Sequence, residues 1–384
     1  MEKRLKKAIG LEGFVFLFLL LAASVAVGRT MGVTNMFNTI MRTAHQLILN
    51  TVLFLMGIMV LAGAMGALLC EFGVIAIFQK ILSPLMKPVY DLPGAAALGL
   101  VTTYLSDNPA IIPLARDKEF KRYFKKYQMP ALTNLGTCFG MGLVVTTFMM
   151  SQKSPLGENF ITAALIGNLG AIIGGIISVR LMLMGTKKRF GKEEWLIPPM
   201  EADDSYLSKR EVRAGSIGKR FLEALLEGGK SGVDMGLSVI PGVVIICTLV
   251  FILSGGPSES GLFTGAAFEG IGVFGWLGNK LSFIINPLFG FQSGQAIAFP
   301  ITSLGAVGAA IGLVPGFLAK GLIGGNEIAV FTAIGMCWSG YLGTHVAMMD
   351  ALGFRELTGR AIVSHTIGGL CGGVAAHFIY VLLR

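Results

Sequence analysis

The chain has 384 residues, of which 53% are hydrophobic and only 14% are charged, whereas soluble domains carry about a quarter charged residues. This composition excludes an ordinary water-soluble protein and predicts an all-α polytopic membrane protein whose first partner is the lipid bilayer. The net charge of +9 is no sign of nucleic-acid binding, because the basic residues gather in a few segments between apolar runs.

Chemistry-bearing motifs are missing from the sequence. The five cysteines lie within or at the ends of apolar runs, without the spacing of a Cys/His metal site. There is no glycine-rich phosphate loop, nucleophile elbow or zinc-protease motif. We therefore expect no catalytic residues, no metal and no cofactor, and we do not expect an enzyme.

Seven apolar runs approach the roughly 20 residues that a helix needs to cross a hydrocarbon core of about 30 Å. They are 13–28, 47–70, 131–150, 161–184, 236–254, 329–349 and 361–383. The first run follows the basic segment MEKRLKK, as the apolar part of a signal peptide would. No small-residue cleavage site follows it, so we interpret it as a span.

Lysines and arginines orient these spans. They are concentrated in 1–12, 79–130, 185–231 and 350–360 and are sparse elsewhere. By the positive-inside rule, the segments rich in basic residues are cytoplasmic. The N-terminus is then inside and the C-terminus outside, in the cytoplasmic membrane of a prokaryote.

Two further apolar segments fit re-entrant hairpins. Residues 91–115 lie between two basic segments, so they must enter and leave on one side, and they are too short for two crossings. A second hairpin, about 288–318, would open on the external side. The alternative is a pair of ordinary helices in each place, within a nine- or eleven-span bundle. Prolines disfavour it, because they interrupt long helices; they are Pro93, Pro109, Pro113, Pro300 and Pro315.

The two halves of the chain resemble each other at a spacing of 199 residues. Residues 133–151 align with 332–350, and after a one-residue gap 167–175 align with 365–373. The order span, interfacial helix, hairpin, span, span occurs twice, and three crossings per unit turn the second copy upside down. Inverted-topology repeats are characteristic of alternating-access carriers, which hold the solute near the midplane.

The repeat predicts four parts of the chain. They are an extra span with an external linker (1–45), a first gate-like repeat (46–185), a cytoplasmic linker with an amphipathic helix (186–231) and a second, inverted repeat (232–384).

The segment SDNPAIIPLARD, which closes the first hairpin, and the TNLGTC…VVTTFMMSQKSPLGENF segment behind it resemble the nucleoside-recognition, or gate-domain, membrane proteins. These include the spore maturation A and B proteins, each of which resembles one half of this chain, so that the chain looks like the two proteins fused. More distantly they include the core of concentrative nucleoside transporters. The resemblance covers about 46–384. The spore maturation pattern ends this hairpin with small residues, whereas this chain has Asp107-Asn108-Pro109, so the family name does not identify the solute.

Polar residues inside apolar segments are the candidates for function, because in hydrocarbon every polar group needs a partner. In the first hairpin they gather near a predicted break, where free backbone groups could bind a solute and Asp107 could carry a coupling charge. The candidates there are Thr102, Thr103, Ser106, Asp107 and Asn108. Equally, Asp107 and Asn108 could merely cap the helix that follows.

The second hairpin offers Thr302 and Ser303 in the place of Thr102 and Thr103, although both hydroxyls could simply bond to neighbouring helices. On the spans, the candidates for solute binding are Asn134, Asn168, Thr332 and Thr366. His345 and His365 are candidates for ion coupling, although a buried histidine is more often structural. Glu71, at the end of a span, is expected to be interfacial.

These features predict a secondary transporter of a small polar solute, nucleoside-like or another organic compound, working by alternating access and driven by H⁺ or Na⁺ or equilibrative. Its partners would be the solute, the coupling ion and further copies of the chain in a homo-oligomer. The alternatives are a non-transporting membrane component of an envelope or sporulation process, a lipid flippase or an ion channel. A carrier keeps polar residues in both hairpins, as here, whereas a scaffold needs none.

Overall fold

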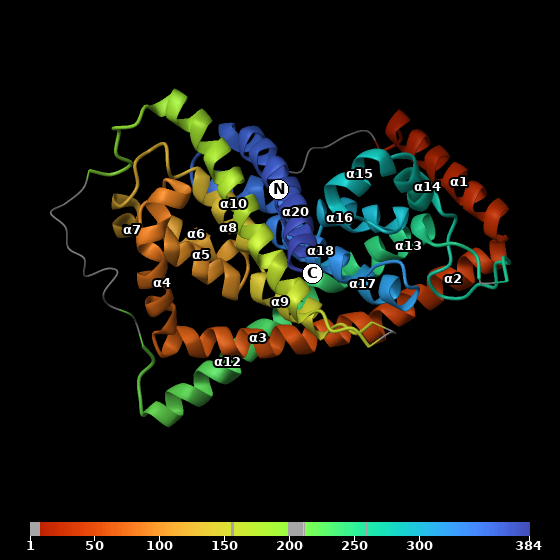
Figure 1. Ribbon diagram of the computed structural model, residues 1–384, viewed down its shortest axis with the longest axis horizontal. Helices are drawn as coiled ribbons and strands as arrows, with labels where there is room; N and C mark the ends of the chain where they lie inside the picture. The colour runs from red at the N-terminus through yellow and green to blue at the C-terminus, as the bar shows by residue number, and fades with distance from the viewer. Residues whose placement is uncertain (1–7, 155–156, 199–209, 211, 259) are drawn as a thin grey trace.

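The computed structural model describes residues 8–154, 157–198, 210, 212–258 and 260–384, and these residues are predominantly helical (Figure 1). The basic residues within 1–7, predicted to be cytoplasmic, lie outside them. Six described helices, counting 131–151 as one, are long and apolar enough to cross a membrane. The predicted class, an all-α polytopic membrane protein, is confirmed.

The first half of the chain contains α1 (Leu11–Met31), α2 (Val33–Gln46), η1 (Leu47–Val52), α3 (Leu53–Glu71), α4 (Val74–Leu85), η2 (Met86–Tyr90), α5 (Ala96–Leu105), η3 (Asn108–Ala110), α6 (Ile111–Arg116), α7 (Lys118–Arg122), α8 (Ala131–Phe139), α9 (Gly142–Ser151) and α10 (Ile161–Phe190).

The second half contains α12 (Ile217–Pro241), η4 (Gly242–Cys247), α13 (Thr248–Ser254), α14 (Val273–Lys280), α15 (Ser282–Phe289), η5 (Gly294–Ile297), α16 (Ala298–Ser303), α17 (Val307–Ala319), α18 (Gly325–Cys337), α19 (Tyr341–Ala351), η6 (Arg355–Leu357) and α20 (Thr358–Leu383).

The crossing of α10 and α20 shows how the repeats are related. A Cβ on Gly170 would lie 2.6 Å from the Gly372 carbonyl oxygen, and one on Gly174 would lie 2.6 Å from that of Gly368. The sequence alignment pairs Gly170 with Gly368 and Gly174 with Gly372, so exchanging the two helices reproduces the same contact. A pseudo-two-fold axis therefore passes through this crossing, where small residues let the backbones touch.

Each repeat also contains a broken span. Helices α8 and α9 are separated at Gly140 and Met141, and α18 and α19 are separated around Ser339 and Gly340. Met141 (φ 54°) and Gly340 (φ 64°), 199 residues apart, are both left-handed. The predicted spans 131–150 and 329–349 are thus each present as two helices in sequence, with a break that the sequence analysis did not predict. The seventh predicted span is the pair α18–α19.

Both predicted hairpins enter and leave at one end, as their hydrogen bonds show. In the first, the Gln128 side chain donates to the Asp91 carbonyl oxygen over 2.8 Å. In the second, the Gln292 N–H donates to the Glu327 carboxylate over 2.7 Å. Their helices are also too short to cross, since α5 has 10 residues and α17 has 13. The predicted re-entrant hairpins are confirmed.

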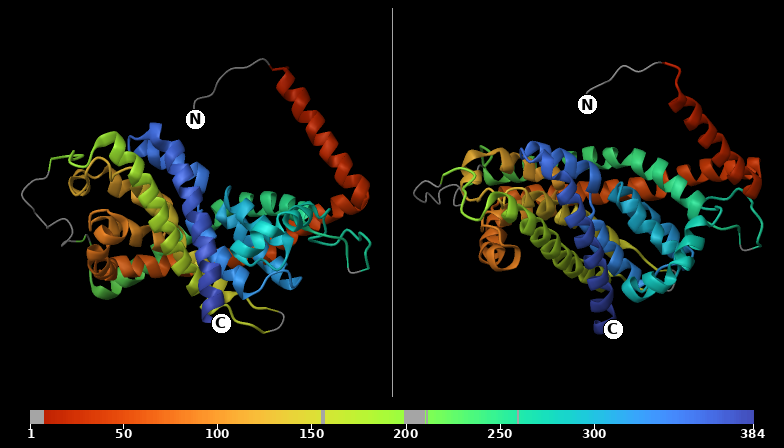
Figure 2. Two further views of the ribbon diagram at one scale, coloured as in Figure 1. Left: turned by 45° about the horizontal axis from the view of Figure 1, so that its top comes forward. Right: turned by 90° about the horizontal axis from the view of Figure 1, so that it is seen from above.

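Two spans are longer than predicted. A continuous helix of 39 residues covers Val33–Glu71, so part of the predicted external linker is α2. Likewise, a helix of 38 residues covers Ile217–Ser254, so the amphipathic helix predicted in the cytoplasmic linker runs directly into the next span. Helix α1 leaves the body at an angle (Figure 2). A largely apolar groove of about 940 Å³ is lined by residues of α1, α2, η4 and α13.

Ion pairs and hydrogen bonds connect the loop segments at each of two ends of the molecule. Segments predicted to be cytoplasmic meet through the ion pairs Lys187–Asp91 (2.5 Å), Lys125–Glu193 (2.8 Å) and Arg189–Glu356 (3.2 Å). We call this end the basic face. Segments predicted to be external meet through Glu158–Arg384 (2.9 Å) and through the Asn35 amide, which donates to the Phe263 carbonyl oxygen over 2.8 Å.

Candidate functional site

The tip of the first hairpin lies on the break of α18–α19. The Asn108 amide nitrogen donates to the Ser339 carbonyl oxygen over 2.5 Å, and the Ser339 hydroxyl donates to the Asn108 amide oxygen over 3.2 Å. The Ser339 hydroxyl also lies 3.3 Å from the Thr137 carbonyl oxygen in α8. A broken helix leaves carbonyl groups without partners inside the helix. Asn108 satisfies one of them, and it thereby joins the hairpin to the broken span of the other repeat.

Within the part of the chain that the structure describes, Asp107 bonds only to its chain neighbour: its carboxylate accepts the N–H of Asn108 over 2.7 Å at the start of the short helix η3. A capping side chain accepts the N–H of the second or third helical residue. This contact is therefore not that of a cap, and both the capping role and the coupling role of Asp107 stay predictions.

A cavity of about 440 Å³ lies between the first hairpin and the crossed helices α3 and α12. Two predicted solute-binding residues line it, Thr102 and Ser106, together with apolar side chains of the hairpin. Glycines shape its other wall. A Cβ on Gly66 would lie 3.2 Å from the Leu105 carbonyl oxygen, and one on Gly63 would lie 2.4 Å from that of Gly228. Small residues here bring α3 close both to the hairpin and to α12.

Charged residues at one end of this cavity bond to each other. Arg213 contacts Glu227 and Glu71 over 2.6 Å each, and Arg220 contacts Glu71 over 2.6 Å. Glu71 is 4% exposed, so a carboxylate that we expected to be interfacial is buried between two arginines. Of the residues that line the cavity, Arg213 and Glu227 carry charge, and they form an ion pair.

A second polar group ties the hairpin to α9 and α10. Asn168, predicted to bind solute, accepts the Tyr104 hydroxyl over 3.0 Å and donates to the Thr146 hydroxyl over 2.9 Å. We did not predict Tyr104 or Thr146. Thr366, the counterpart of Asn168, contacts the Tyr341 hydroxyl.

A third group is a buried chain of hydrogen bonds beside the break of α18–α19. The Asn134 amide donates to the Ser178 hydroxyl over 2.9 Å, and that hydroxyl lies 2.9 Å from His365 Nδ1. The rings of His365 and His345 have centroids 4.6 Å apart. His345 Nδ1 lies 2.7 Å from the Tyr341 carbonyl oxygen. The structure therefore brings three predicted residues together, with Ser178 as a link that we did not predict.

The remaining predicted hydroxyls bond to their own helices. Thr103 donates to the Gly99 carbonyl oxygen over 2.9 Å, and Thr302 donates to that of Ala298 over 2.7 Å, which is the same bond 199 residues later. The repeat thus pairs Thr302 with Thr103, whereas we had paired it with Thr102. Ser303 and Thr332 make equivalent bonds, and none of these four hydroxyls lines the cavity.

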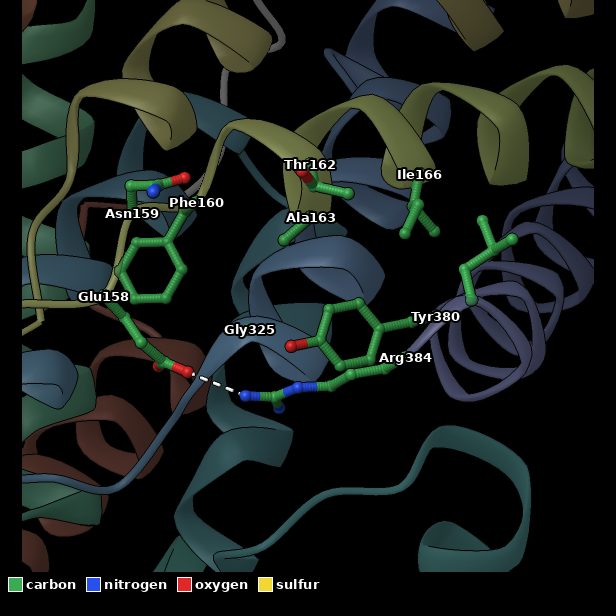
Figure 3. A pocket seen from close by; sticks show the side chains of 10 residues that line it. Glu158, Asn159, Phe160, Thr162, Ala163, Ile166, Gly325, Tyr380 and Arg384 are labelled. Atoms are coloured by element: carbon green, nitrogen blue, oxygen red, sulfur yellow. Dashed lines mark hydrogen bonds and ion pairs between the residues drawn. The ribbon is translucent and has the colours of Figure 1, made fainter.

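A separate pocket of about 200 Å³ lies at the opposite end from the basic face, where α10 and α18 begin and α20 ends (Figure 3). Figure 3 shows the Glu158–Arg384 ion pair at its edge, with Tyr380 beside Arg384. A Cβ on Gly325 would lie 2.1 Å from the Tyr380 hydroxyl, so a larger residue there would displace the Tyr380 side chain. No predicted solute-binding residue lines this pocket.

Comparisons with known proteins decide the fold. No protein-family model matches the sequence, and no curated protein matches it. Solved structures of CNTnw, a concentrative nucleoside transporter, do match. A variant in an outward-facing state is 14% identical, covering 97% of this chain and 86% of that chain with a TM-score of 0.58. The inward-facing substrate-bound state is 15% identical, covering 94% and 86% with a TM-score of 0.55.

A CNTnw variant in an intermediate state is 13% identical and covers 97% of this chain and 85% of that chain, with a TM-score of 0.51. The chain has the fold of a concentrative nucleoside transporter. The distant part of the predicted resemblance is thus confirmed at the level of fold, and the resemblance to fused spore maturation proteins stays a prediction.

Proposed function

We propose that this protein is a secondary membrane transporter that moves a small organic solute by alternating access. The observation that carries the proposal is the pair of broken spans at equivalent positions of an inverted repeat, with a cavity between one hairpin and the α3–α12 crossing. Transporters of the same fold, solved in outward-facing, intermediate and inward-facing states, support it.

The cavity favours a neutral solute. Its volume of about 440 Å³ lies within the roughly 300–1,000 Å³ of pockets that hold drug-sized ligands. Apolar side chains and the polar residues Thr102 and Ser106 line it, while Arg213 and Glu227 neutralise each other. A nucleoside-like compound, with an apolar ring face and several hydroxyls, belongs to the class that such a lining suits.

The predicted division of the chain is part of this proposal. Residues 46–185 and 232–384 form the two inverted repeats, with 1–45 and 186–231 outside them. The N-terminus and the basic face lie in the cytoplasm of a prokaryote, the C-terminus lies outside, and the chain works as a homo-oligomer. A cation gradient drives transport, with Asp107, His345 and His365 as the candidate residues.

A thermal-shift screen of the detergent-purified protein tests the proposal. We expect a neutral organic solute, from a panel of nucleosides, amino acids, organic acids and metal ions, to raise the melting temperature. The same solute should then accumulate in proteoliposomes faster than in protein-free liposomes. If no compound that shifts the melting temperature crosses the membrane faster in proteoliposomes, the transport proposal is wrong.

A further inference from the structure

We propose that His365, with His345 beside it, forms a proton-binding site, so that H⁺ is the coupling ion of this transporter. The inference rests on the transport function proposed above and goes further by naming the ion and the atoms that bind it.

Both ring nitrogens of His365 face oxygen atoms. Nε2 contacts the Cys337 carbonyl oxygen, and Nδ1 lies 2.9 Å from the Ser178 hydroxyl oxygen. A protonated imidazole needs two acceptors, because both of its nitrogens then donate. Carbonyl and hydroxyl oxygens accept hydrogen bonds, so these two atoms can hold the charged ring without rearrangement of the chain.

The Cys337 carbonyl oxygen has a second property that favours a cation. Cys337 is the last residue of α18, a helix of 13 residues that ends at the break. The last carbonyl groups of a helix lack partners within it and carry the negative end of the helix dipole. The ring of His365 thus lies where a helix end attracts positive charge.

The groups around the two rings can be named helix by helix. From α8, the Cys138 sulfur lies 3.7 Å from His365 Nδ1; from α19, the Tyr341 ring stacks on His365 with centroids 5.9 Å apart. From α18, Cys337 contributes its carbonyl, and α10 contributes Ser178. Among the described residues, no hydrogen bond or ion pair joins either ring to Asp, Glu, Lys or Arg. A charge on one ring therefore disfavours a second on the other, and the pair holds one proton at most.

Two buried acceptors near this site have no donor. They are His345 Nε2 and Asn134 Oδ1, and both side chains are 0% exposed. Buried acceptors are rarely left unpaired, so this network has fewer hydrogen-bond donors than acceptors. The cluster is built around the four imidazole nitrogens of His345 and His365, whereas a hard cation such as Na⁺ takes a full shell of oxygen ligands. The chemistry of the cluster thus suits a proton better than a sodium ion.

The position of the site links proton binding to movement. His365, on α20, bonds the end of α18, while His345 belongs to α19 and its ring centroid lies 4.6 Å from that of His365, so the ring pair connects the two parts of the broken span. The Trp338 indole N–H, within the break, donates to the His365 carbonyl oxygen over 3.4 Å. Charging His365 strengthens its bond to α18 and thereby favours the arrangement of the broken span that is described here. A ligand that binds one state better shifts the population toward it.

Trp338 provides a native reporter for the test. Trp195 and Trp276 are replaced by Phe, and the fluorescence of Trp338 is followed in lipid nanodiscs between about pH 3 and 8, a window that extends below the range of an exposed histidine because both rings are buried. We expect one transition that fits the binding of a single proton. His365→Gln should abolish it. The control His377→Gln, on the same helix but bonded to Asn326, should keep it.

Ser178→Ala gives an independent reading should His365→Gln fail to fold. Losing the acceptor at Nδ1 should move the transition to lower pH by about one unit, because a hydrogen bond to a charged group is lost. A flat titration in the parent protein, or an unchanged transition in a folded His365→Gln or Ser178→Ala variant, would overturn the proposal. The measurement uses no solute, so this failure is distinct from a failure of the transport assays.

Discussion

Asn108 marks the point at which the two repeats differ chemically. The spacing of 199 residues pairs it with Val307, which packs toward Gly335 in α18. Asn108 instead makes two hydrogen bonds to Ser339, across the repeat axis. A polar link between a hairpin tip and a broken span is therefore present in the first hairpin, and its counterpart position in the second hairpin is apolar.

Removing either partner of this link should destabilise the protein. For Asn108→Ala and Ser339→Ala we expect losses of about 1–3 kcal/mol each, because a buried polar partner is left unpaired. The double variant should lose less than the sum, with a coupling of about 1 kcal/mol. Unfolding in mixed detergent measures all four proteins. Additive losses would show that the two side chains do not act together.

Asp91 holds the root of the first hairpin on the basic face. Its φ of 58° is left-handed, as is the φ of 65° at Gly290, its counterpart. Burial of the carboxyl raises its pKa, but hydrogen bonds from Lys187 and Lys87 outweigh this effect and hold the pKa of Asp91 below its usual value. These ion pairs therefore contribute stability above the unfolded-state pKa, and the contribution is lost as the pH falls through the folded-state pKa.

Asp91→Asn isolates this charge, because asparagine also tolerates a left-handed backbone. We expect a loss of about 1 kcal/mol at neutral pH, as is typical of partly exposed ion pairs. The difference from the parent protein should begin to shrink below about pH 4, where Asp91 becomes protonated in the unfolded chain, and should vanish at lower pH, where it becomes protonated in the folded protein. The control is Glu193→Gln, which removes a 90% exposed partner of Lys125 and should change stability little. A difference that grew with acidity would contradict the assignment.

At the scale of elements, the broken spans show what the sequence could and could not predict. The lengths of the apolar runs and the positions of the basic residues predicted the spans, the hairpins and the inverted orientation of the second repeat. They could do so because a bilayer strongly constrains the length and charge of the segments that cross it. They did not predict the breaks, since FGMG and WSGY contain no proline and remain apolar enough to cross. The left-handed residues at both places, 199 residues apart, lie in breaks that pack against Asn108 of the first hairpin, a tertiary contact that hydropathy does not report.

Gly340 should be far less tolerant of substitution than a neighbouring glycine. At Gly340 the φ is 64°, and an added Cβ would lie 2.3 Å from Thr344 Oγ1. We expect Gly340→Ala to cost at least about 2 kcal/mol through backbone strain and this overlap. Gly343→Ala, where nothing lies within 4 Å, should instead stabilise α19 by up to about 1 kcal/mol. Equal melting temperatures for the two variants would contradict the role of the break.

At the scale of the whole molecule, the location of the cavity depends on which helix faces meet. Composition identified Thr102, Ser106, Thr302 and Ser303 as equally good candidates, yet only the first two line the cavity. Thr102 bonds a carbonyl of its own helix just as Thr302 and Ser303 do. The difference is that Thr102 and Ser106 border the cavity beside the glycines of α3 and α12, whereas Thr302 and Ser303 are buried. Such differences arise from tertiary contacts between distant segments, so a single sequence does not predict them.

The native cysteines can report how this cavity opens. Cys70 is exposed and lines the cavity, while Cys138, Cys247 and Cys337 are buried. With Cys371 replaced by Ser, a charged, membrane-impermeant maleimide should therefore modify Cys70 alone. The reagent should reach it from the basic face, which places the label in the cytoplasm if the proposed orientation holds.

Arg213 should control the rate of this modification. Its side chain bonds Glu71, next to Cys70, and Glu227 on the opposite wall, so it holds the linker across the end of the cavity. We expect Arg213→Gln to speed the labelling of Cys70 several-fold, because both ion pairs are lost. Arg189→Gln, which breaks an exposed pair with Glu356 elsewhere on the basic face, should leave the rate unchanged. Equal rates of Cys70 labelling in the Arg213→Gln variant and its parent would mean that this ion-pair network does not close the cavity. The cavity would then have to open by movement of the first hairpin against Gly66.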